Sequence, residues 1–230
     1  QQLGERLLKG KTGSIVAIHP ETGEILCLAT NSPQGPQLSL AIAKAYAPGS
    51  TFKVITAAAA LEDGIVSPDK VFLNEGKCWD WWKSNPKIKS EKPICDTHVY
   101  GDMDMEEAMV QSSNIVFAKI ADEVGAEKLY RMARNFGFGM KTSENFYGEE
   151  SGRLYMPYEL PRDARTLKTM GFGHSVMVTP IQMVMAYAAV ANGGMLMEPM
   201  IVKEWRDSDG NLAVSCLKHS PRKIFSLQKF

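Results

Sequence analysis

Hydrophobic and polar positions alternate near the start of the chain and predict a β-hairpin over residues 13–30. Apolar β-forming residues flank the turn Pro20-Glu21-Thr22-Gly23. A second strand–turn–strand pattern covers residues 199–205, 206–211 and 212–215. The chain therefore begins and ends in predicted strands.

Between these strands the pattern changes to helical. Helices are predicted at about 50–62, 104–110, 114–124 and 126–135, with Gly125 separating the last two. Thr179 followed by Pro180 predicts another helix start, and Gly193-Gly194 predicts its end. Strands at both ends with helices between them indicate an α+β domain.

The start of the helix at 50–62 carries the most informative chemistry. Pro48-Gly49 breaks the backbone just before Ser50, and Lys53 follows one turn later. Residues three apart share a helix face, so the lysine amine can reach the serine hydroxyl. A partly desolvated lysine with a lowered pKa can take the hydroxyl proton, and the helix N-terminus favours a developing oxyanion. This arrangement is typical of an acyl-transfer serine.

The Ser-x-x-Lys pattern has little weight alone, because the chain contains five other matches: Ser67/Lys70, Ser84/Lys87, Ser215/Lys218, Ser220/Lys223 and Ser226/Lys229. Among them, only Ser50 opens a long apolar helix behind a Pro-Gly break. These residues alone leave open a structural interpretation in which Ser50 is simply a helix N-cap.

A second motif, Ser112-Ser113-Asn114, lies between the helices predicted at 104–110 and 114–124. An Asn side chain carries both amide donors and an acyl oxygen, so Asn114 can hold a peptide backbone and also bond Lys53. The triplet also fits a helix cap, and Ser143-Glu144-Asn145 shows that similar triplets occur by chance.

Pro48-Gly49-Ser50-Thr51-Phe52-Lys53, followed about sixty residues later by Ser112-Ser113-Asn114, resembles the penicillin-binding proteins, above all the class B, monofunctional transpeptidases. Further segments are similar to landmarks of that family in the same order: residues 13–25, 135–139, 148–152, 171–174, 178–182 and 191–194. The similarity covers most of positions 12–205.

The resemblance implies a serine β-lactamase/penicillin-binding-protein-like fold, with an antiparallel sheet packed with helices, as one transpeptidase domain over residues 1–230. It implies peptidoglycan D,D-transpeptidation, in which stem peptides are cross-linked through a Ser50 acyl-enzyme. Lys53 is then the base, Ser112 protonates the leaving nitrogen, and Asn114 binds substrate. β-Lactams are expected to acylate Ser50, and neither a metal nor an organic cofactor is expected.

The third box of that family, Lys-Thr/Ser-Gly, does not occur after Asn114 in this sequence. Lys11-Thr12-Gly13 precedes Ser50 and enters the first strand, so we interpret it as a coincidence. We therefore expect a domain truncated before the third motif. Such a chain would be weakly active or inactive alone, unless a second polypeptide supplies the missing donors.

The bulk composition narrows the class of protein. The hydrophobic content of 44% is enough for a core, and 26 basic residues balance 26 acidic ones, which gives no support to nucleic-acid binding. No run approaches the roughly 18 apolar residues of a membrane span. By resemblance, we expect a parent protein anchored by a segment outside this sequence. It would act in the periplasm or at the outer face of the cytoplasmic membrane, within a cell-wall synthesis complex.

Cys78 and Cys95 flank a loop rich in Trp, Lys and Pro, and they can pair in an oxidising compartment, although the spacing leaves the pairing open. Three tryptophans in this loop, Trp79, Trp81 and Trp82, fit either a binding lip or packing under the loop.

Two other functions remain as alternatives. A class D β-lactamase or β-lactam sensor shows a similar first box, but its second box normally has Val where this chain has Asn114. A non-catalytic or split fragment acting as a cell-wall scaffold fits the missing third box. The intact set of Ser50, Lys53, Ser112 and Asn114 argues against the scaffold.

Overall fold

The computed structural model describes residues 1–33, 39–74, 76–84, 88, 91–144, 146–160, 165–215 and 221–225. They fall into two units. Unit 1 comprises the described residues of Gln1–Tyr46, Arg134–Arg153 and Met177–Gln228, and unit 2 comprises those of Ala47–Ala133 and Leu154–Val176.

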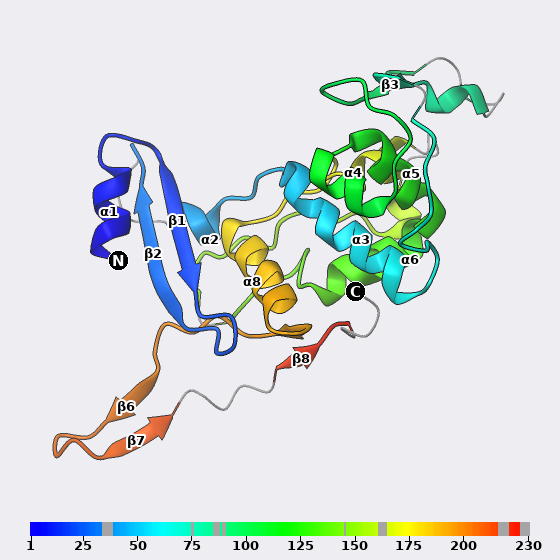
Figure 1. Ribbon diagram of the computed structural model, residues 1–230. Coiled ribbons are helices and arrows are strands. Elements are labelled where there is room, and N and C mark those ends of the chain that lie inside the picture. Colours follow the sequence, from blue (N-terminus) through cyan, green and yellow to red (C-terminus); the bar gives the residue numbers. More distant parts are fainter. Residues whose placement is uncertain are drawn as a thin grey trace. The chain divides into compact units, whose positions relative to one another are not determined.

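Unit 1 is built on the predicted hairpin, which the structure confirms (Figure 1). Strands β1 (Gly13–Ile18) and β2 (Ile25–Asn31) pair antiparallel, with Ile15 opposite Ala29. Helix α1 (Gln2–Leu8) lies against one side of the hairpin, where Gly4 approaches Cys27 and Ala29. Helices α2 (Leu40–Ala43) and α8 (Pro180–Ala191) also pack on the hairpin.

Helix α8 begins where the sequence predicts, at Thr179-Pro180. The Thr179 hydroxyl accepts a hydrogen bond from the Gln182 backbone, and the Gln182 side chain accepts one from the Thr179 backbone, which forms a capping box. Ile181 and Met185 of this helix form a buried cluster with Ile42 and Phe146. Helix α8 therefore contacts both the hairpin and the buried cluster of unit 1.

The remaining strands of unit 1 form short antiparallel pairs: β5 (Met195–Leu196) with β8 (Arg222–Lys223), and β6 (Glu204–Arg206) with β7 (Leu212–Ser215). The β6–β7 pair extends away from the rest of the unit (Figure 1). It confirms the second predicted strand pair, but its first strand is shorter than the predicted 199–205. The reason is that Met200 instead bridges to Glu24 at the end of the hairpin.

Unit 2 is mainly helical. It contains the 3-10 helix η1 (Gly49–Phe52), α3 (Lys53–Glu62), α4 (Met105–Gln111), α5 (Asn114–Val124), most of α6 (Ala126–Asn135), η3 (Pro157–Glu159) and α7 (Arg165–Met170). Helices α3, α4, α5 and α6 confirm the predicted ones, while α1, α2 and α7 were not predicted. These three are short, at seven, four and six residues, so their periodicity is weak.

Helices α3 and α5 pack against each other in the core of unit 2. Small side chains line α3 from Ala57 to Ala60, while α5 presents large ones, including Phe117 and Ile120, and all of these are buried. Small residues let two helices approach closely, because no bulky side chain separates their backbones. Both helices are apolar on most faces, which is typical of helices enclosed by protein.

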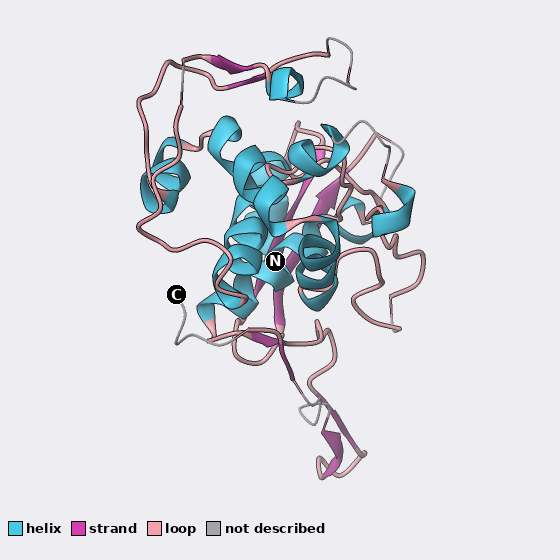
Figure 2. Ribbon diagram, turned by 90° about the vertical axis from the view of Figure 1, so that its right-hand side faces the viewer, coloured by secondary structure: helices cyan, strands magenta, loops and turns pink. Residues whose placement is uncertain are grey.

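A disulfide ribbon, defined here as residues 76–84 and 91–96, lies at one end of these helices (Figures 1 and 2). Strands β3 (Cys78–Trp79) and β4 (Ile94–Cys95) pair directly, and a disulfide joins Cys78 to Cys95. The 3-10 helix η2 (Trp81–Ser84) follows β3. The pairing that the sequence left open is therefore formed.

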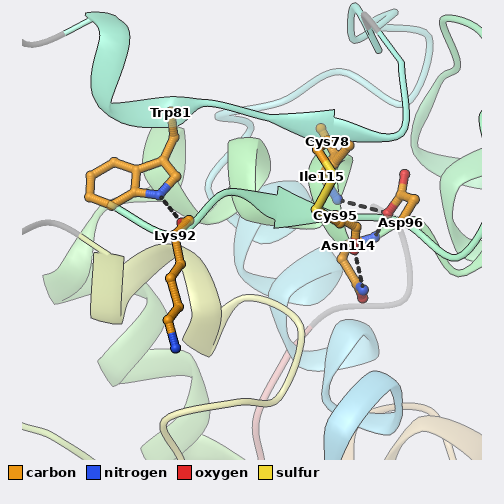
Figure 3. The surroundings of a disulfide bond; sticks show 7 residues. All are labelled: Cys78, Trp81, Lys92, Cys95, Asp96, Asn114 and Ile115. Carbon is orange, nitrogen blue, oxygen red and sulfur yellow. Dashed lines mark hydrogen bonds between the residues drawn. A yellow bond between two sulfur atoms is a disulfide. The ribbon is translucent and has the colours of Figure 1, made fainter. Parts of the chain in front are cut away.

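Packing explains the aromatic residues of the ribbon. Trp81 is only 3% exposed, and its indole N–H donates to the Lys92 carbonyl (Figure 3). The buried ammonium of Lys168 pairs with Asp122 and lies over the rings of Trp79 and Trp81. Through these contacts the Lys168 ammonium links the ribbon to α5 and α7.

The segment Gly171-Phe172-Gly173 contacts both η1 and the first turn of α3. The Thr56 hydroxyl donates to the Gly171 carbonyl at 2.8 Å, and the Gly49 N–H donates to the Gly173 carbonyl at 3.0 Å. A Cβ on Gly173 would lie 1.8 Å from the Gly49 carbonyl oxygen, and Gly173 has a φ of +81°. Glycine is therefore required there for the backbone to contact the residue that precedes Ser50.

We predict that Gly173→Ala destabilises unit 2 more than Gly64→Ala does. Both glycines have positive φ, so each substitution should cost about 1–2 kcal/mol in backbone strain. Gly64 has open space at its Cβ position, while at Gly173 the clash adds roughly 1–3 kcal/mol. Urea unfolding of the two variants measures the difference, and equal losses would contradict the close contact.

Candidate active site

Ser50 lies in η1, immediately before α3, with an exposed side chain. The cap positions of η1 and α3 are Pro48 and Phe52, and neither makes a side-chain cap hydrogen bond. The interpretation of Ser50 as a plain N-cap is therefore wrong, because the helical turn begins before this serine. Its hydroxyl instead accepts a hydrogen bond from Lys53 Nζ at 3.1 Å.

The Lys53 amine is the centre of the site. Its side chain is 1% exposed, and Nζ lies within hydrogen-bond distance of four oxygens: Ser50 Oγ at 3.1 Å, Ser112 Oγ at 2.9 Å, Asn114 Oδ1 at 3.0 Å and the Ser112 carbonyl. The Phe117 ring lies 5.7 Å from Nζ. The structure thus brings together all four residues that the sequence singled out.

The Ser-Ser-Asn motif forms the turn between α4 and α5, as predicted. Ser112 is the C-cap of α4 in a left-handed conformation, with φ 57° and ψ 40°, and Asn114 is the first residue of α5. The middle residue, Ser113, is the N-cap of α5 and accepts from the Val116 N–H. The helix-cap interpretation therefore holds for Ser113, while the two outer residues turn toward Lys53.

A left-handed non-glycine residue costs of order 1–3 kcal/mol and persists only where its surroundings hold it. Here the Lys53 amine contacts both the carbonyl and the hydroxyl of Ser112. The turn conformation is what allows one residue to present both oxygens to one nitrogen.

Asp96, which sequence reasoning missed, lies behind this turn. It follows Cys95, is 4% exposed, and accepts hydrogen bonds from the Asn114 and Ile115 backbone N–H groups (Figure 3). The Asn114 amide donates to the Cys95 carbonyl at 3.1 Å. An acidic residue favours a helix N-terminus, but Asp96 is 18 positions away from Asn114 in the chain. Only the fold reveals the pairing.

The environment of Lys53 lowers its pKa from 10.5 to about 8. Burial is the larger cause, because it disfavours the charged ammonium, and the negative charge of Asp96 opposes it by raising the pKa. A substantial fraction of Lys53 is therefore neutral near pH 8 and can act as a base.

The four oxygens around Nζ are of two kinds. The Ser112 carbonyl and Asn114 Oδ1 can only accept hydrogen bonds, whereas the Ser50 and Ser112 hydroxyls can accept or donate. A neutral amine has two N–H donors, which the two permanent acceptors can take. Its lone pair is then left to the hydroxyls, which suits proton removal from a serine.

Asn114 also borders open space. It lines a cavity of about 220 Å³ together with Ile94, Thr169, Phe172 and His174, all from unit 2. One face of the Asn114 side chain is therefore engaged with Lys53, while another adjoins room for a ligand.

Comparison with known proteins identifies the family of this chain. Residues 13–228 match the family described as the penicillin binding protein transpeptidase domain. The chain belongs to this family. The resemblance stated from the motifs is confirmed, and so is the α+β fold.

Two curated members of the penicillin-binding transpeptidase family illustrate the relationship. Stage V sporulation protein D of Bacillus subtilis is 35% identical over 204 residues, which cover 84% of this chain and 30% of the relative. The probable peptidoglycan D,D-transpeptidase PenA of Neisseria meningitidis is 29% identical over 211 residues, which cover 85% and 33%. The chain spans about a third of the length of these relatives.

A solved structure shows the same fold. The D,D-transpeptidase domain of a peptidoglycan glycosyltransferase from Eggerthella lenta aligns with a TM-score of 0.83 at 26% identity, covering 98% of this chain and 60% of that one. In the part of this chain that the structure describes, no helix combines the length and apolarity needed to cross a bilayer.

We predict that the depressed pKa of Lys53 makes stability depend on pH. Between about pH 8 and 10.5 the unfolded chain holds a proton on Lys53 that the folded chain has lost, so this group makes the unfolding free energy rise with pH. Relative to Lys53→Met, the wild type should gain roughly 2–4 kcal/mol across that range. Denaturant unfolding at several pH values measures the difference. A difference that does not change with pH would show that Lys53 titrates normally.

Proposed function

We propose that this protein is a peptidoglycan D,D-transpeptidase domain that works through a Ser50 acyl-enzyme. The observation that carries the proposal is the buried Lys53 amine, which contacts Ser50, Ser112 and Asn114 simultaneously. Family membership and the name of the Neisseria relative support the choice of substrate. The proposal accounts for why these polar groups converge on one partly desolvated base.

In the first step, neutral Lys53 takes the proton of the Ser50 hydroxyl as Ser50 Oγ attacks the carbonyl carbon between two terminal D-alanines. A tetrahedral intermediate forms, and its oxyanion develops near the N-terminal turn of α3, where backbone N–H groups favour negative charge. Lys53 is then an ammonium, whose third N–H can be taken by a serine hydroxyl. The proton has moved over one hydrogen bond of 3.1 Å.

In the second step, the carbon–nitrogen bond breaks and the leaving nitrogen needs a proton. Ser112 is placed to deliver it, because its hydroxyl accepts from Lys53 Nζ at 2.9 Å and can pass on its own proton. Free D-alanine leaves, Lys53 returns to the neutral amine, and the peptide remains as an ester of Ser50. Asn114 holds the peptide backbone from the cavity side.

The acyl-enzyme is then resolved by an amine of a neighbouring stem peptide. The amine attacks the ester carbonyl, its proton passes to the base, and Ser50 regains its hydrogen as the new amide closes the cross-link. A β-lactam offers an amide carbonyl in place of the peptide and leaves a covalent ester on Ser50, because its leaving group stays attached.

We also infer that both units form one transpeptidase domain, since the matched span of 13–228 runs through both. Peptidoglycan lies outside the cytoplasmic membrane. The protein therefore acts in the periplasm or at the outer face of the cytoplasmic membrane, with a cell-wall synthesis complex as its partner.

We predict that a fluorescent penicillin labels the protein covalently at Ser50. Ser50→Ala should abolish the label, while Ser67→Ala should keep it at the wild-type level. Ser67 is a matched control, because it is exposed and precedes Lys70 in another Ser-x-x-Lys pattern, but Lys70 pairs with Glu123 instead. Intact mass spectrometry should find one adduct per chain.

Two results would contradict this prediction. An adduct that survives Ser50→Ala would place the nucleophile elsewhere, and rapid release of the adduct as hydrolysed penicillin would indicate a β-lactamase. A stable wild-type adduct lost only in Ser50→Ala supports the acyl-enzyme.

The acylation rate should also depend on pH. The second-order rate constant with the same penicillin should rise with pH through a midpoint near 8, because the neutral fraction of Lys53 rises there. Lys53→Arg should be acylated at least about a hundredfold more slowly, since guanidinium stays protonated. A rate that is flat from pH 6 to 9 would exclude Lys53 as the base.

A further inference from the structure

Behind the acylation site, one buried carboxylate gathers the groups that build the Ser-Ser-Asn turn. Asp96 accepts four hydrogen bonds: from Ser113 Oγ at 2.7 Å, the Asn114 N–H, the Ile115 N–H at 3.1 Å and Asn74 Nδ2 at 3.2 Å. Three of these donors belong to consecutive residues at the start of α5. A carboxylate that accepts so many hydrogen bonds is rigidly held.

Successive side chains of the Ser112-Ser113-Asn114 turn face two different residues in alternation. Ser112 and Asn114 face the Lys53 amine, whereas Ser113 between them faces Asp96. Ser113 also links Asp96 to α5, because its oxygen accepts a hydrogen bond from the Val116 N–H at 3.1 Å. The first three N–H groups of α5 are thus satisfied by Asp96 and Ser113, so the helix start cannot rotate without breaking these bonds.

Asp96 is itself fixed by the disulfide ribbon. It directly follows β4, and its backbone N–H donates to the Lys77 carbonyl at 2.9 Å, next to Cys78. The Asn114 amide adds a bond to the Cys95 carbonyl. The ribbon therefore holds the Asp96 carboxylate in place, and the carboxylate holds the Ser112-Ser113-Asn114 turn in place.

We propose that Asp96 is a positioning residue of the acylation site, whose carboxylate holds the turn from which Ser112 and Asn114 reach Lys53. The inference rests on the proposed function, and it assigns to Asp96 a role in the reaction without contact to the substrate. Loss of the carboxylate should let the strained Ser112 relax away from Lys53.

The charge of Asp96 gives this role a specific signature. The groups that face Lys53 are the hydroxyls of Ser50 and Ser112, the Ser112 carbonyl, the amide of Asn114 and the Phe117 ring, which are all neutral. Asp96 is the charged residue whose field acts on the amine, and it raises the pKa of Lys53 against the effect of burial. Removing the charge should lower that pKa further, which a purely structural role elsewhere would not do.

Asp96→Asn separates charge from shape. Its amide oxygen can still accept from the two backbone N–H groups, and its amide nitrogen can donate to Ser113 Oγ. The Asn74 Oδ1 atom has no hydrogen-bond partner in the structure, so that side chain can turn to accept as well. The substitution therefore keeps the shape of the network and removes the negative charge, but it weakens the network, because a neutral amide oxygen accepts weaker hydrogen bonds than a carboxylate and the Ser113 O–H loses its acceptor.

The test is the pH profile of penicillin acylation for the wild type, Asp96→Asn and two companions. For Asp96→Asn we expect a limiting rate constant lower by about tenfold or more and a midpoint lower by roughly half a pH unit or more. Ser113→Ala keeps the charge and removes one link of the network. It should lower the limiting rate with the midpoint unchanged.

Asp104→Ala is the matched control for simple destabilisation. Asp104 is the N-cap of α4, and its carboxylate accepts from the Glu107 N–H at 2.8 Å, so the variant loses a carboxylate cap without touching the Lys53 environment. It should keep the wild-type midpoint and a rate within about twofold of the wild type.

The outcomes are separable. A wild-type midpoint and rate in Asp96→Asn would overturn the role of Asp96 and leave Ser50 acylation intact. If Asp96→Asn does not fold, Ser113→Ala decides, and a wild-type rate there would overturn the proposal. If the wild type itself is not acylated, the proposed function fails and the role of Asp96 fails with it.

Discussion

The burial of one amine is the constraint on which the helical unit depends. Lys53 is 1% exposed, and a buried ammonium without partners would be very costly, so its surroundings must supply oxygens. They come from η1, from the end of α4 and from the start of α5. The need to satisfy this nitrogen fixes where those three elements meet. The same burial makes the amine a usable base, so the stability requirement and the chemistry have one physical origin.

The surrounding structure holds the site under strain. Ser112 has a left-handed backbone, and Lys53 lies in an environment that disfavours its charge. These costs are offset by the tightly packed contact of α3 with α5, whose alanines and large apolar residues are almost fully buried. Gly173 approaches the backbone of Gly49 in η1, and Gly171 approaches Phe117 and Ala121 of α5, so closely that neither glycine has room for a side chain. Rigid packing around this strained centre holds the four polar side chains of the candidate site in fixed relative positions.

Much of this fold could be predicted from the sequence. The hairpin, the helices at 50–62, 104–110, 114–124 and 126–135, and the helix start at Thr179-Pro180 were clear because each is a long periodic segment or a strong start signal. The short elements were missed, including α7 and the two-residue strands around the disulfide. They gain their order from contacts with distant segments, such as the cation of Lys168 over the ribbon tryptophans. Local pattern carries no information about such contacts.

The features of the candidate site also divide into those that the sequence predicts and those that only the fold reveals. The sequence by itself determined that Ser50 and Lys53 share a helical turn, because their spacing of three is a local property of the backbone. It also determined that Ser112 and Asn114 lie on a turn between two helices. Only the tertiary structure decided that the two motifs meet at one nitrogen, that Ser50 is free of any capping role, and that Cys78 pairs with Cys95. It alone placed Asp96 behind the turn, since burial and the proximity of residues far apart in the chain arise only when the helices pack.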